Sequence, residues 1–534
     1  MAADCEVSLR ILTNILANGF TRLWSAGLQF LLTPVFVRLL GTESFGLVAF
    51  FNTVLFTFVF LDWAISPALT REVARMMGSD GAEQGMANLL RTFELVTWLV
   101  AVFLAISLFC AAEWITHSWL NIGKIDPATA TMAVRMMAVI LIAQWPISLY
   151  GAGFVALFRQ STLGVIRVCG TTIQMGGALI LLYFYHGTIT TYFAWQALVS
   201  GLTTFALAFT LWRAMPIAPR PARFSLQVLK STWRFSIGNL LIGFASCVLA
   251  QADKLIVAKF TNLLSLAAYS LCFTLALLIT NLIVAPVQSI LLPRFSLFVA
   301  RGEDAILAQE YQLWTQLLAV LSFPIAAVLI GLPSEVVSLW LGRHIDLLPQ
   351  MRFLLPPVAL GAALSAITFP VYCLQLATGW TRLSVVKNAI ALAVVLPTLW
   401  LLVPLYGPIV GAWCWLGVNL GYYFIEVPVM HRRVLKGSMR EWYLRSTLPA
   451  FAVTLIPSML ANLFVPTGLT LTVQFLLVFG MIITVFWGLV LLLPYPRDLL
   501  FWLIRNCAVI MTNRSLSGLM RAWEGQAVGG TKDI

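Results

Sequence analysis

The stretch ILTNILANGFTRLWSAGLQFLLTPVFV (11–37) is followed, across the short segment RLLGTE (38–43), by SFGLVAFFNTVLFTFVFLDWAIS (44–66). Each apolar block has roughly the 20 residues that a helix needs to cross a bilayer. Similar blocks recur along a chain of 534 residues that is 60% hydrophobic and only 10% charged. Soluble proteins carry roughly 25% charged residues, so the expected solvent is lipid. Uninterrupted blocks favour helices over the ~10-residue alternating strands of a barrel.

The apolar blocks predict an all-α polytopic membrane protein. We expect fourteen spans, approximately at 11–37, 44–66, 89–111, 131–158, 164–186, 190–212, 235–258, 264–293, 310–332, 350–377, 385–405, 408–430, 446–465 and 470–493.

The basic residues predict the orientation of these spans. With the N-terminus inside, 25 of the 33 Lys and Arg fall in cytoplasmic segments, when the first four residues of the spans that leave the cytoplasm are counted with them, and four fall outside: Arg38, Lys124, Lys259 and Arg343. This bias follows the positive-inside rule, and it predicts an inner (plasma) membrane protein with both termini cytoplasmic. The net charge of +12 thus belongs to short loops, and nucleic acid is not an expected partner.

A weak internal repeat suggests how the spans are grouped. A shift of 221 residues aligns Asn18 with Asn239 and Ser25 with Ser246, and a shift of six spans preserves topology, as in parallel repeats. We expect an N-terminal lobe at 1–215, a C-terminal lobe at 216–432, two additional spans at 433–495, and a basic amphipathic tail at 496–534. The tail is interpreted either as a helix on the inner leaflet or as a frayed end with a short fifteenth apolar stretch.

The first predicted span carries a polar stripe. Spacings of 4, 4, 3 and 4 place five residues on one helix face: Asn14, Asn18, Arg22, Ser25 and Gln29. Arg22 lies near the middle of this predicted span, where an arginine costs about 2.5–3.5 kcal/mol. We expect Asn18, Arg22, Ser25 and Gln29 to line a cavity that binds an anionic substrate. The alternative is a structural ion pair between Arg22 and Glu94 or Asp62.

Other charges in or near the predicted spans are candidates of two kinds. Three bases are candidates for substrate binding, namely Lys254, Arg135 and Arg352, although the last two start their spans and could extend to the interface. Three acids are candidates for gating or ion coupling: Asp62, Asp253 and Glu426. Adjacent helical residues point about 100° apart, so at most one of Asp253 and Lys254 needs to face a cavity.

Catalytic and metal-binding patterns are absent from the sequence. The four histidines are dispersed without an HExxH pair, and there is no GxxxxGK[ST] phosphate-binding motif. We therefore expect a protein that is not an enzyme and that has no cofactor and no metal site. Transport would draw on an ion gradient or on the gradient of the substrate itself.

Three segments resemble a known family. The stretch PVFVRLLGTESFGLVAFFNTVLFTFVFLDWAISPALTREVAR (34–75), with its RLLGTESFG turn and closing LDW, is similar to the opening of bacterial polysaccharide flippases. These are the O-antigen and exopolysaccharide translocases of the multidrug/oligosaccharidyl-lipid/polysaccharide exporter superfamily. Further on, DKLIVAKFTNLLSLAAYS (253–270) and LLPRFS (291–296) resemble the second half of the same family.

This resemblance implies a fold and a function. The family has two six-helix lobes in a V around a central cavity, to which this chain would add two C-terminal helices. Its members move an undecaprenyl-pyrophosphate-linked oligosaccharide to the outer leaflet by alternating access, with proton or sodium coupling, beside a glycan polymerase and a chain-length regulator. The family's cationic cavity matches Arg22 and Lys254 here. The repeat partner of Arg22 is Gly243, so the two lobes would differ in charge.

The sequence is compatible with two other functions. An ion-coupled exporter of cationic drugs on the same architecture would need acidic cavity residues, whereas the deep charge of the first span is basic. A membrane-embedded glycan polymerase or glycosyltransferase would need a catalytic surface outside the membrane. The longest outer loops, near 112–130 and 333–349, hold few acids.

Overall fold

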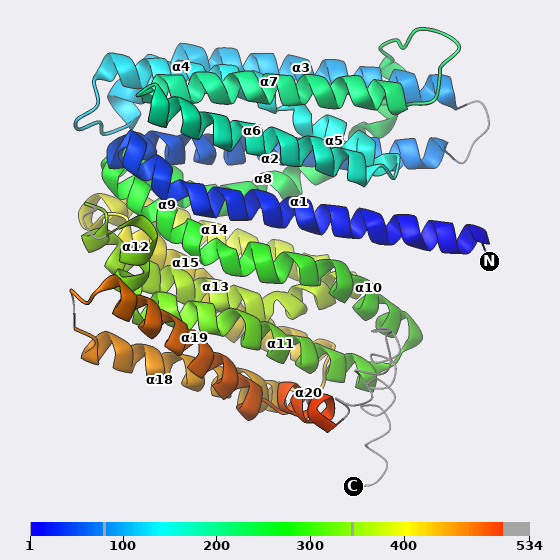
Figure 1. The fold of residues 1–534 in the computed structure, drawn as a ribbon. Helices are drawn as coiled ribbons and strands as arrows, with labels where there is room; N and C mark the ends of the chain where they lie inside the picture. The colour runs from blue at the N-terminus through cyan, green and yellow to red at the C-terminus, as the bar shows by residue number, and fades with distance from the viewer. Residues whose placement is uncertain (1, 78–81, 343–345, 467, 506–534) are drawn as a thin grey trace. The chain divides into compact units, whose positions relative to one another are not determined.

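The computed structural model describes residues 2–77, 82–342, 346–466 and 468–505, and this part of the chain is helical without a β-strand (Figure 1). With π-helical turns labelled η, the elements are α1 (Ala2–Leu40), α2 (Thr42–Met76), α3 (Glu83–Trp114), η1 (Ile115–Trp119), α4 (Pro127–Gln144), α5 (Pro146–Ala156), α6 (Gln160–Phe184), α7 (Ile189–Ala214), α8 (Leu226–Phe260), α9 (Leu263–Leu278), η2 (Ile279–Val284), α10 (Ala285–Arg301), α11 (Asp304–Gly331), α12 (Pro333–Leu341), α13 (Leu348–Ala377), α14 (Thr381–Tyr406), α15 (Ile409–Gly421), η3 (Tyr422–Glu426), α16 (Val427–Arg433), α17 (Met439–Glu441), η4 (Trp442–Thr447), α18 (Leu448–Phe464), α19 (Leu471–Leu492) and α20 (Pro494–Arg505).

The chain is an all-α polytopic membrane protein. Within the described residues, 12 helical stretches are long and apolar enough to cross a membrane. The two other predicted spans, 235–258 and 408–430, fall on α8 and on the run from α15 to α16. The second of these runs carries Asn419 and Glu426, which lower its apolar character. The count of fourteen therefore stays a prediction.

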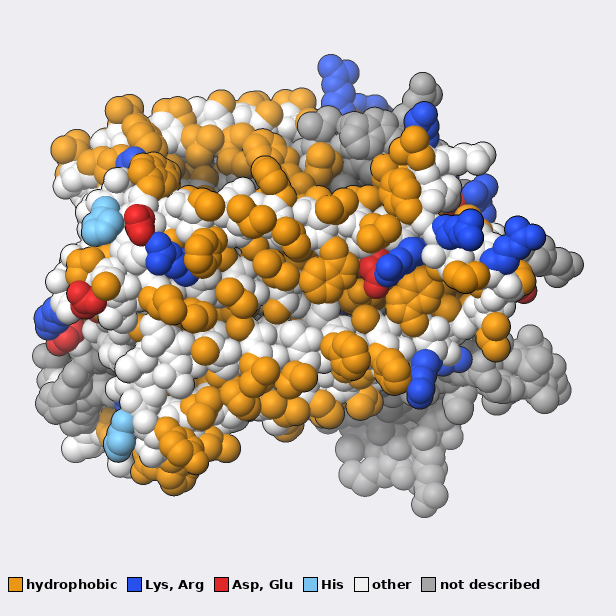
Figure 2. All heavy atoms as spheres, turned by 90° about the horizontal axis from the view of Figure 1, so that it is seen from above, with side chains coloured by type: hydrophobic (Ala, Val, Ile, Leu, Met, Phe, Trp, Pro, Cys, Tyr) orange, Lys and Arg blue, Asp and Glu red, His pale blue; other side chains and the backbone are white. Residues whose placement is uncertain are grey.

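The outward faces of the helices are suited to lipid. Large apolar side chains are exposed along them, among them Leu99 at 70%, Phe205 at 69% and Leu463 at 75%. On the face shown in Figure 2, hydrophobic side chains cover the middle, and most Lys and Arg lie toward the helix ends. This distribution is the one expected of helices that expose apolar surface to hydrocarbon and charge to the interface.

The helices form two compact units. The first comprises Met1–Leu282, Pro333–Gly361 and Thr381–Val418, and the second comprises Ile283–Leu332, Ala362–Trp380 and Asn419–Ile534. The lobes expected at 1–215 and 216–432 stay a prediction. The predicted tail begins with α20, whose Tyr495 N–H donates to Gln316 Oε1 of α11 at 3.0 Å; the rest of the tail lies outside the described residues.

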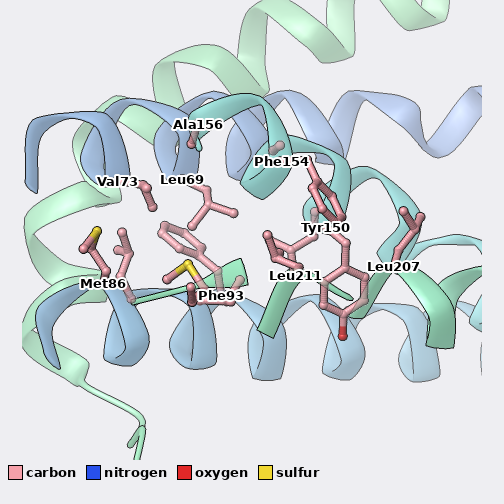
Figure 3. Close-up of a cluster of buried hydrophobic side chains, with 14 of the residues drawn as sticks. Leu69, Val73, Met86, Phe93, Tyr150, Phe154, Ala156, Leu207 and Leu211 are labelled. Atoms are coloured by element: carbon pink, nitrogen blue, oxygen red, sulfur yellow. The ribbon is translucent and has the colours of Figure 1, made fainter. Parts of the chain in front are cut away.

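The core of the first unit lies between α2, α3, α5 and α7 (Figure 3). Leu69 of α2, Phe93 of α3, Phe154 of α5 and Leu211 of α7 are each no more than 2% exposed. Burying a side chain of this size contributes about 1.5–3 kcal/mol in water. In lipid the gain comes from close packing instead. This core fixes α5 against its neighbours.

The second unit has an aromatic core. Trp442 is fully buried, and its ring centroid lies 5.6 Å from Tyr423, 5.7 Å from His431 and 6.4 Å from Tyr311. Its indole Nε1 donates to Thr315 Oγ1 at 3.2 Å. The indole N–H is thus satisfied inside the packed cluster, as buried Trp requires.

Tight turns join the helices that surround the candidate site. Gly41, with φ +86°, separates α1 from α2, and Thr261 and Asn262 separate α8 from α9. The two helices α2 and α9 cross closely, because a Cβ built on Gly46 would lie 2.8 Å from the carbonyl carbon of Leu263. Glycine at this position lets the backbones approach, as is common in packed membrane helices.

Candidate functional site

A polar cavity of about 360 Å³ lies within the first unit, between α1, α2, α8, α9 and the start of η2. Its polar lining consists of amides, hydroxyls and one ammonium: Gln29, Thr33, Asn52, Thr53, Gln251, Lys254, Ser270, Thr274 and Asn281. Aromatic rings complete the wall, among them Phe30, which stacks on Trp340 of α12 at 5.1 Å between centroids. A polar stripe in an apolar helix is expected to face such a cavity rather than lipid.

Lys254 is the only charged residue among the described residues that line this cavity. Its side chain is 15% exposed. The ammonium Nζ donates to the Ala250 carbonyl at 3.2 Å and to Gln251 Oε1 at 3.5 Å, and it lies 4.8 Å from the centroid of the Phe273 ring. The cavity therefore presents one positive charge among neutral hydrogen-bonding groups.

Asp253 turns away from the cavity. Tyr269 of α9 donates its hydroxyl to Asp253 Oδ2 at 2.6 Å, and the other oxygen, Oδ1, lies 3.9 Å from Lys254 Nζ. Oδ1 has no hydrogen-bond partner among the described residues. Asp253 and Lys254 are neighbours in the sequence but face different surroundings: the Lys254 ammonium lines the cavity, and the Asp253 carboxylate packs against α9.

The polar stripe of α1 divides between two places. Gln29 lines the cavity, whereas Ser25 and Arg22 lie closer to the N-terminus of α1 and are not among the lining residues. The side chain of Asn18 lies outside the described residues.

The depth of Arg22 in the membrane stays a prediction. The helix α1 continues to Leu40, and Arg22 lies 18 residues before that end, about 27 Å along the helix. A crossing of about 20 residues that ended at Leu40 would place Arg22 near its other end.

Neither carboxylate considered as a structural partner pairs with Arg22. Glu94 instead bonds Arg91 Nη1 at 2.8 Å and accepts from the Tyr150 hydroxyl at 2.6 Å. Asp62 hydrogen-bonds Ser148. Within the described residues Arg22 has no ion pair, and it is exposed.

The remaining candidates are not among the residues that line this cavity. Arg135 Nη2 pairs with Glu113 Oε1 at 2.7 Å, and Arg352 is exposed, with its guanidinium 6.0 Å from the Phe353 ring centroid. Glu426 belongs to the second unit, where it is 3% exposed and accepts a hydrogen bond from Gln375 Nε2. It ends the π-helical turn η3, a type of irregularity that is frequent at functional sites.

Sequence reasoning missed most of the neutral lining. Ser270, Thr274 and Asn281 recur at near-helical spacing on α9 and η2, and Asn52 and Thr53 lie on α2. The same periodicity that singled out α1 could have found the α9 stripe, but its residues are small and lie in a very apolar block. The described residues contain no group of His, Cys, Asp or Glu able to hold a metal ion.

Comparison with known proteins identifies the family of this chain. The family described as polysaccharide biosynthesis protein matches residues 35–346. The succinoglycan biosynthesis transport protein ExoT of Rhizobium meliloti (strain 1021) is 25% identical over 308 residues, which cover 56% of this chain and 56% of ExoT. The chain thus aligns with about half the length of that relative.

Solved structures with the same fold include a flippase and a transporter. The lipid II flippase MurJ in its inward closed conformation has a TM-score of 0.66 at 14% identity, covering 92% of this chain and 100% of MurJ. An inward-facing multidrug resistance MATE family transporter of the MOP superfamily has a TM-score of 0.57 at 14% identity, covering 80% of this chain and 96% of that one. These relatives are transport proteins and not enzymes. The chain belongs to the polysaccharide biosynthesis protein family, and it has the helical fold of MurJ and the MATE transporters.

Proposed function

We propose that this protein is a flippase that moves an undecaprenyl-pyrophosphate-linked oligosaccharide across the inner membrane by alternating access, for exopolysaccharide or lipopolysaccharide (O-antigen) biosynthesis. The family and the transport relatives support a transport role. The observation that carries the choice of substrate is the cavity with Lys254 among amides and hydroxyls.

The cavity chemistry suits a sugar joined to an anion. Amides and hydroxyls both donate and accept hydrogen bonds, as sugar hydroxyls do, and Phe30 and Phe273 offer apolar faces. Moving a charged head group through hydrocarbon without compensation is prohibitive. Lys254 would replace part of the lost hydration, while the polyprenyl tail stays in lipid.

The other charged candidates take supporting roles in this proposal. Arg22, with Asn18, Ser25 and Gln29, would contact the substrate along α1. Asp253, 3.9 Å from Lys254, would act as the counter-charge that holds the ammonium when no substrate is bound. Asp62 and Glu426 are proposed as gating or ion-coupling residues, with Glu426 buried beside Gln375.

The proposed substrate implies partners and a place. A glycan polymerase and a chain-length regulator would act on the flipped substrate, and membrane lipid would hold its tail. The chain would lie in the inner membrane with both termini in the cytoplasm. An exporter of cationic drugs is disfavoured, because the charge that lines the cavity is positive.

A reconstituted flipping assay tests the proposal. We expect Lys254→Gln to slow translocation of an undecaprenyl-diphosphate-linked oligosaccharide roughly tenfold or more, as for a lost charged hydrogen bond, and Lys254→Arg to retain more activity. The matched control is Lys259→Gln on the same helix. Lys259 packs over the Trp119 ring at 4.5 Å and does not line the cavity. A wild-type rate for Lys254→Gln, at equal protein level, would refute the assigned site.

A further inference from the structure

Arg167 is a membrane-helix arginine to which the sequence pattern gave no role. It lies in the second turn of α6 and is half-buried. A Cβ built on Gly151 of α5 would lie 2.8 Å from its Nη2 atom. The missing side chain at Gly151 therefore leaves the space that the guanidinium occupies.

Arg167 has a like-charged neighbour. The Trp24 indole Nε1 donates to Thr172 Oγ1 at 2.9 Å, which fixes the register of α1 against α6, and both helices run in the same direction (Figure 1). Arg22 and Arg167 precede this contact by two and five residues, about 3 and 7.5 Å along the helices. The two charges repel each other. Within the described residues neither arginine has a carboxylate partner.

The two arginines lie at matching depth. Arg22 precedes the end of α1 at Leu40 by 18 residues, and Arg167 precedes the end of α6 at Phe184 by 17 residues, about 27 and 25 Å. Lys254 precedes the end of α8 at Phe260 by only six residues, about 9 Å. In a hydrocarbon core about 30 Å thick, the arginines lie at the end predicted to be cytoplasmic, and Lys254 lies toward the other end.

We propose that Arg22 and Arg167 together form a capture site for a diphosphate group, which binds there from the inner leaflet before it reaches the cavity of Lys254. Two guanidinium forks can each donate two parallel hydrogen bonds to phosphoryl oxygens. Two adjacent cations without a counter-ion are unfavourable in a low-dielectric site, and a dianionic group removes that repulsion. This inference rests on the proposed function and adds to it a residue and a preference for diphosphate over monophosphate.

Binding measurements test the preference. The full-length protein in phosphatidylcholine nanodiscs is titrated with undecaprenyl diphosphate, with undecaprenyl monophosphate and, to distinguish an ordinary lipid head group, with phosphatidylglycerol. We expect the wild type to bind the diphosphate most tightly. Arg167→Gln should weaken diphosphate binding roughly tenfold to a hundredfold and monophosphate binding less, and Arg167→Lys should fall between.

Gly151→Ala tests the geometry without changing any charge. The new Cβ displaces only the flexible end of Arg167, so the fold is kept while diphosphate binding weakens. Gly176→Ala on α6 is the matched control, because nothing lies within 4 Å of its Cβ. Arg213→Gln controls for the loss of one cation, since Arg213 packs over the Phe209 ring at 4.2 Å.

Stability separates a binding role from a structural one. Because the two charges repel in the empty protein, Arg167→Gln should keep or raise the melting temperature. A lower melting temperature with unchanged diphosphate preference would overturn the inference, and so would equal binding of phosphatidylglycerol and the diphosphate. Failure of the wild type to bind either polyprenyl phosphate would instead refute the proposed function.

Discussion

Two glutamates of α3, Glu94 and Glu113, differ in how much their charge contributes to the free energy of unfolding, because their surroundings differ. Glu94 has a side chain that is 7% exposed, and it contacts Arg91, Tyr150 and the Trp212 indole at 3.4 Å. Glu113 is 68% exposed, and its ion-pair partner is Arg135. Both ion pairs are short, but only Glu94 is buried, while its partner Arg91 is 47% exposed. The buried carboxylate is held by hydrogen bonds to charged and neutral donors, which contribute more than an exposed ion pair does.

These two residues give a matched prediction. Glu94→Gln should lower the free energy of unfolding by about 1.5–3 kcal/mol, because it weakens the hydrogen bonds to a buried carboxylate, and Glu113→Gln should lower it by less than about 1 kcal/mol. Equilibrium unfolding in mixed micelles, followed by tryptophan fluorescence, measures both. Equal losses would show that Glu94 is not held in a buried network.

At the scale of elements, α3 anchors the segment that joins α7 to α8. Gln84, Asn88 and Thr92 are spaced by four residues on one helix face. They accept hydrogen bonds from the backbone N–H groups of Arg220 at 2.9 Å, Arg223 at 2.8 Å and Ser225 at 3.0 Å. The segment lacks regular structure of its own, so these side chains satisfy its backbone.

Removing the middle anchor should free this segment. Asn88→Ala should speed trypsin cleavage after Arg223 roughly fivefold to tenfold, because local opening loses a hydrogen bond. Cleavage after Arg220 is not expected, since Pro221 follows it. Ser107→Ala is the control on the same helix, because its hydroxyl donates within α3, to Phe103 O at 2.8 Å. Identical digestion rates for both variants would contradict the anchoring role.

At the scale of the whole molecule, the number of spans determines where the C-terminus lies. Alkaline phosphatase is active only outside the cytoplasm. Fusions after residue 187 should therefore be active, and fusions after residues 217 and 534 should be inactive, if there are fourteen spans with the N-terminus inside. Enzyme activity normalised to fusion level provides the measurement. If the fusion at residue 534 were active while the fusion at residue 217 was inactive, the number of spans between these two positions would have to be odd.

The sequence predicted parts of the candidate site unevenly. Gln29 and Lys254 were found because polar groups stand out in apolar helices, and both line the cavity. Arg135 was selected by the same rule, but it pairs with Glu113. Arg167 was overlooked because its position near the start of α6 made it a loop residue by charge counting. A one-dimensional pattern records which residues are polar but not which neighbours satisfy them.

The sequence by itself determined the solvent and the class of fold, because about 20 apolar residues in succession can be satisfied only as a membrane helix. It also indicated the family, through segments that keep their order along the chain. The tertiary structure decided which polar groups meet. Residues of α1, α2, α8, α9 and η2 share one cavity, among them Gln29 and Asn281, which are 252 positions apart in the sequence. Helix packing sets such contacts, and it depends on side-chain shape across helices rather than on spacing within one.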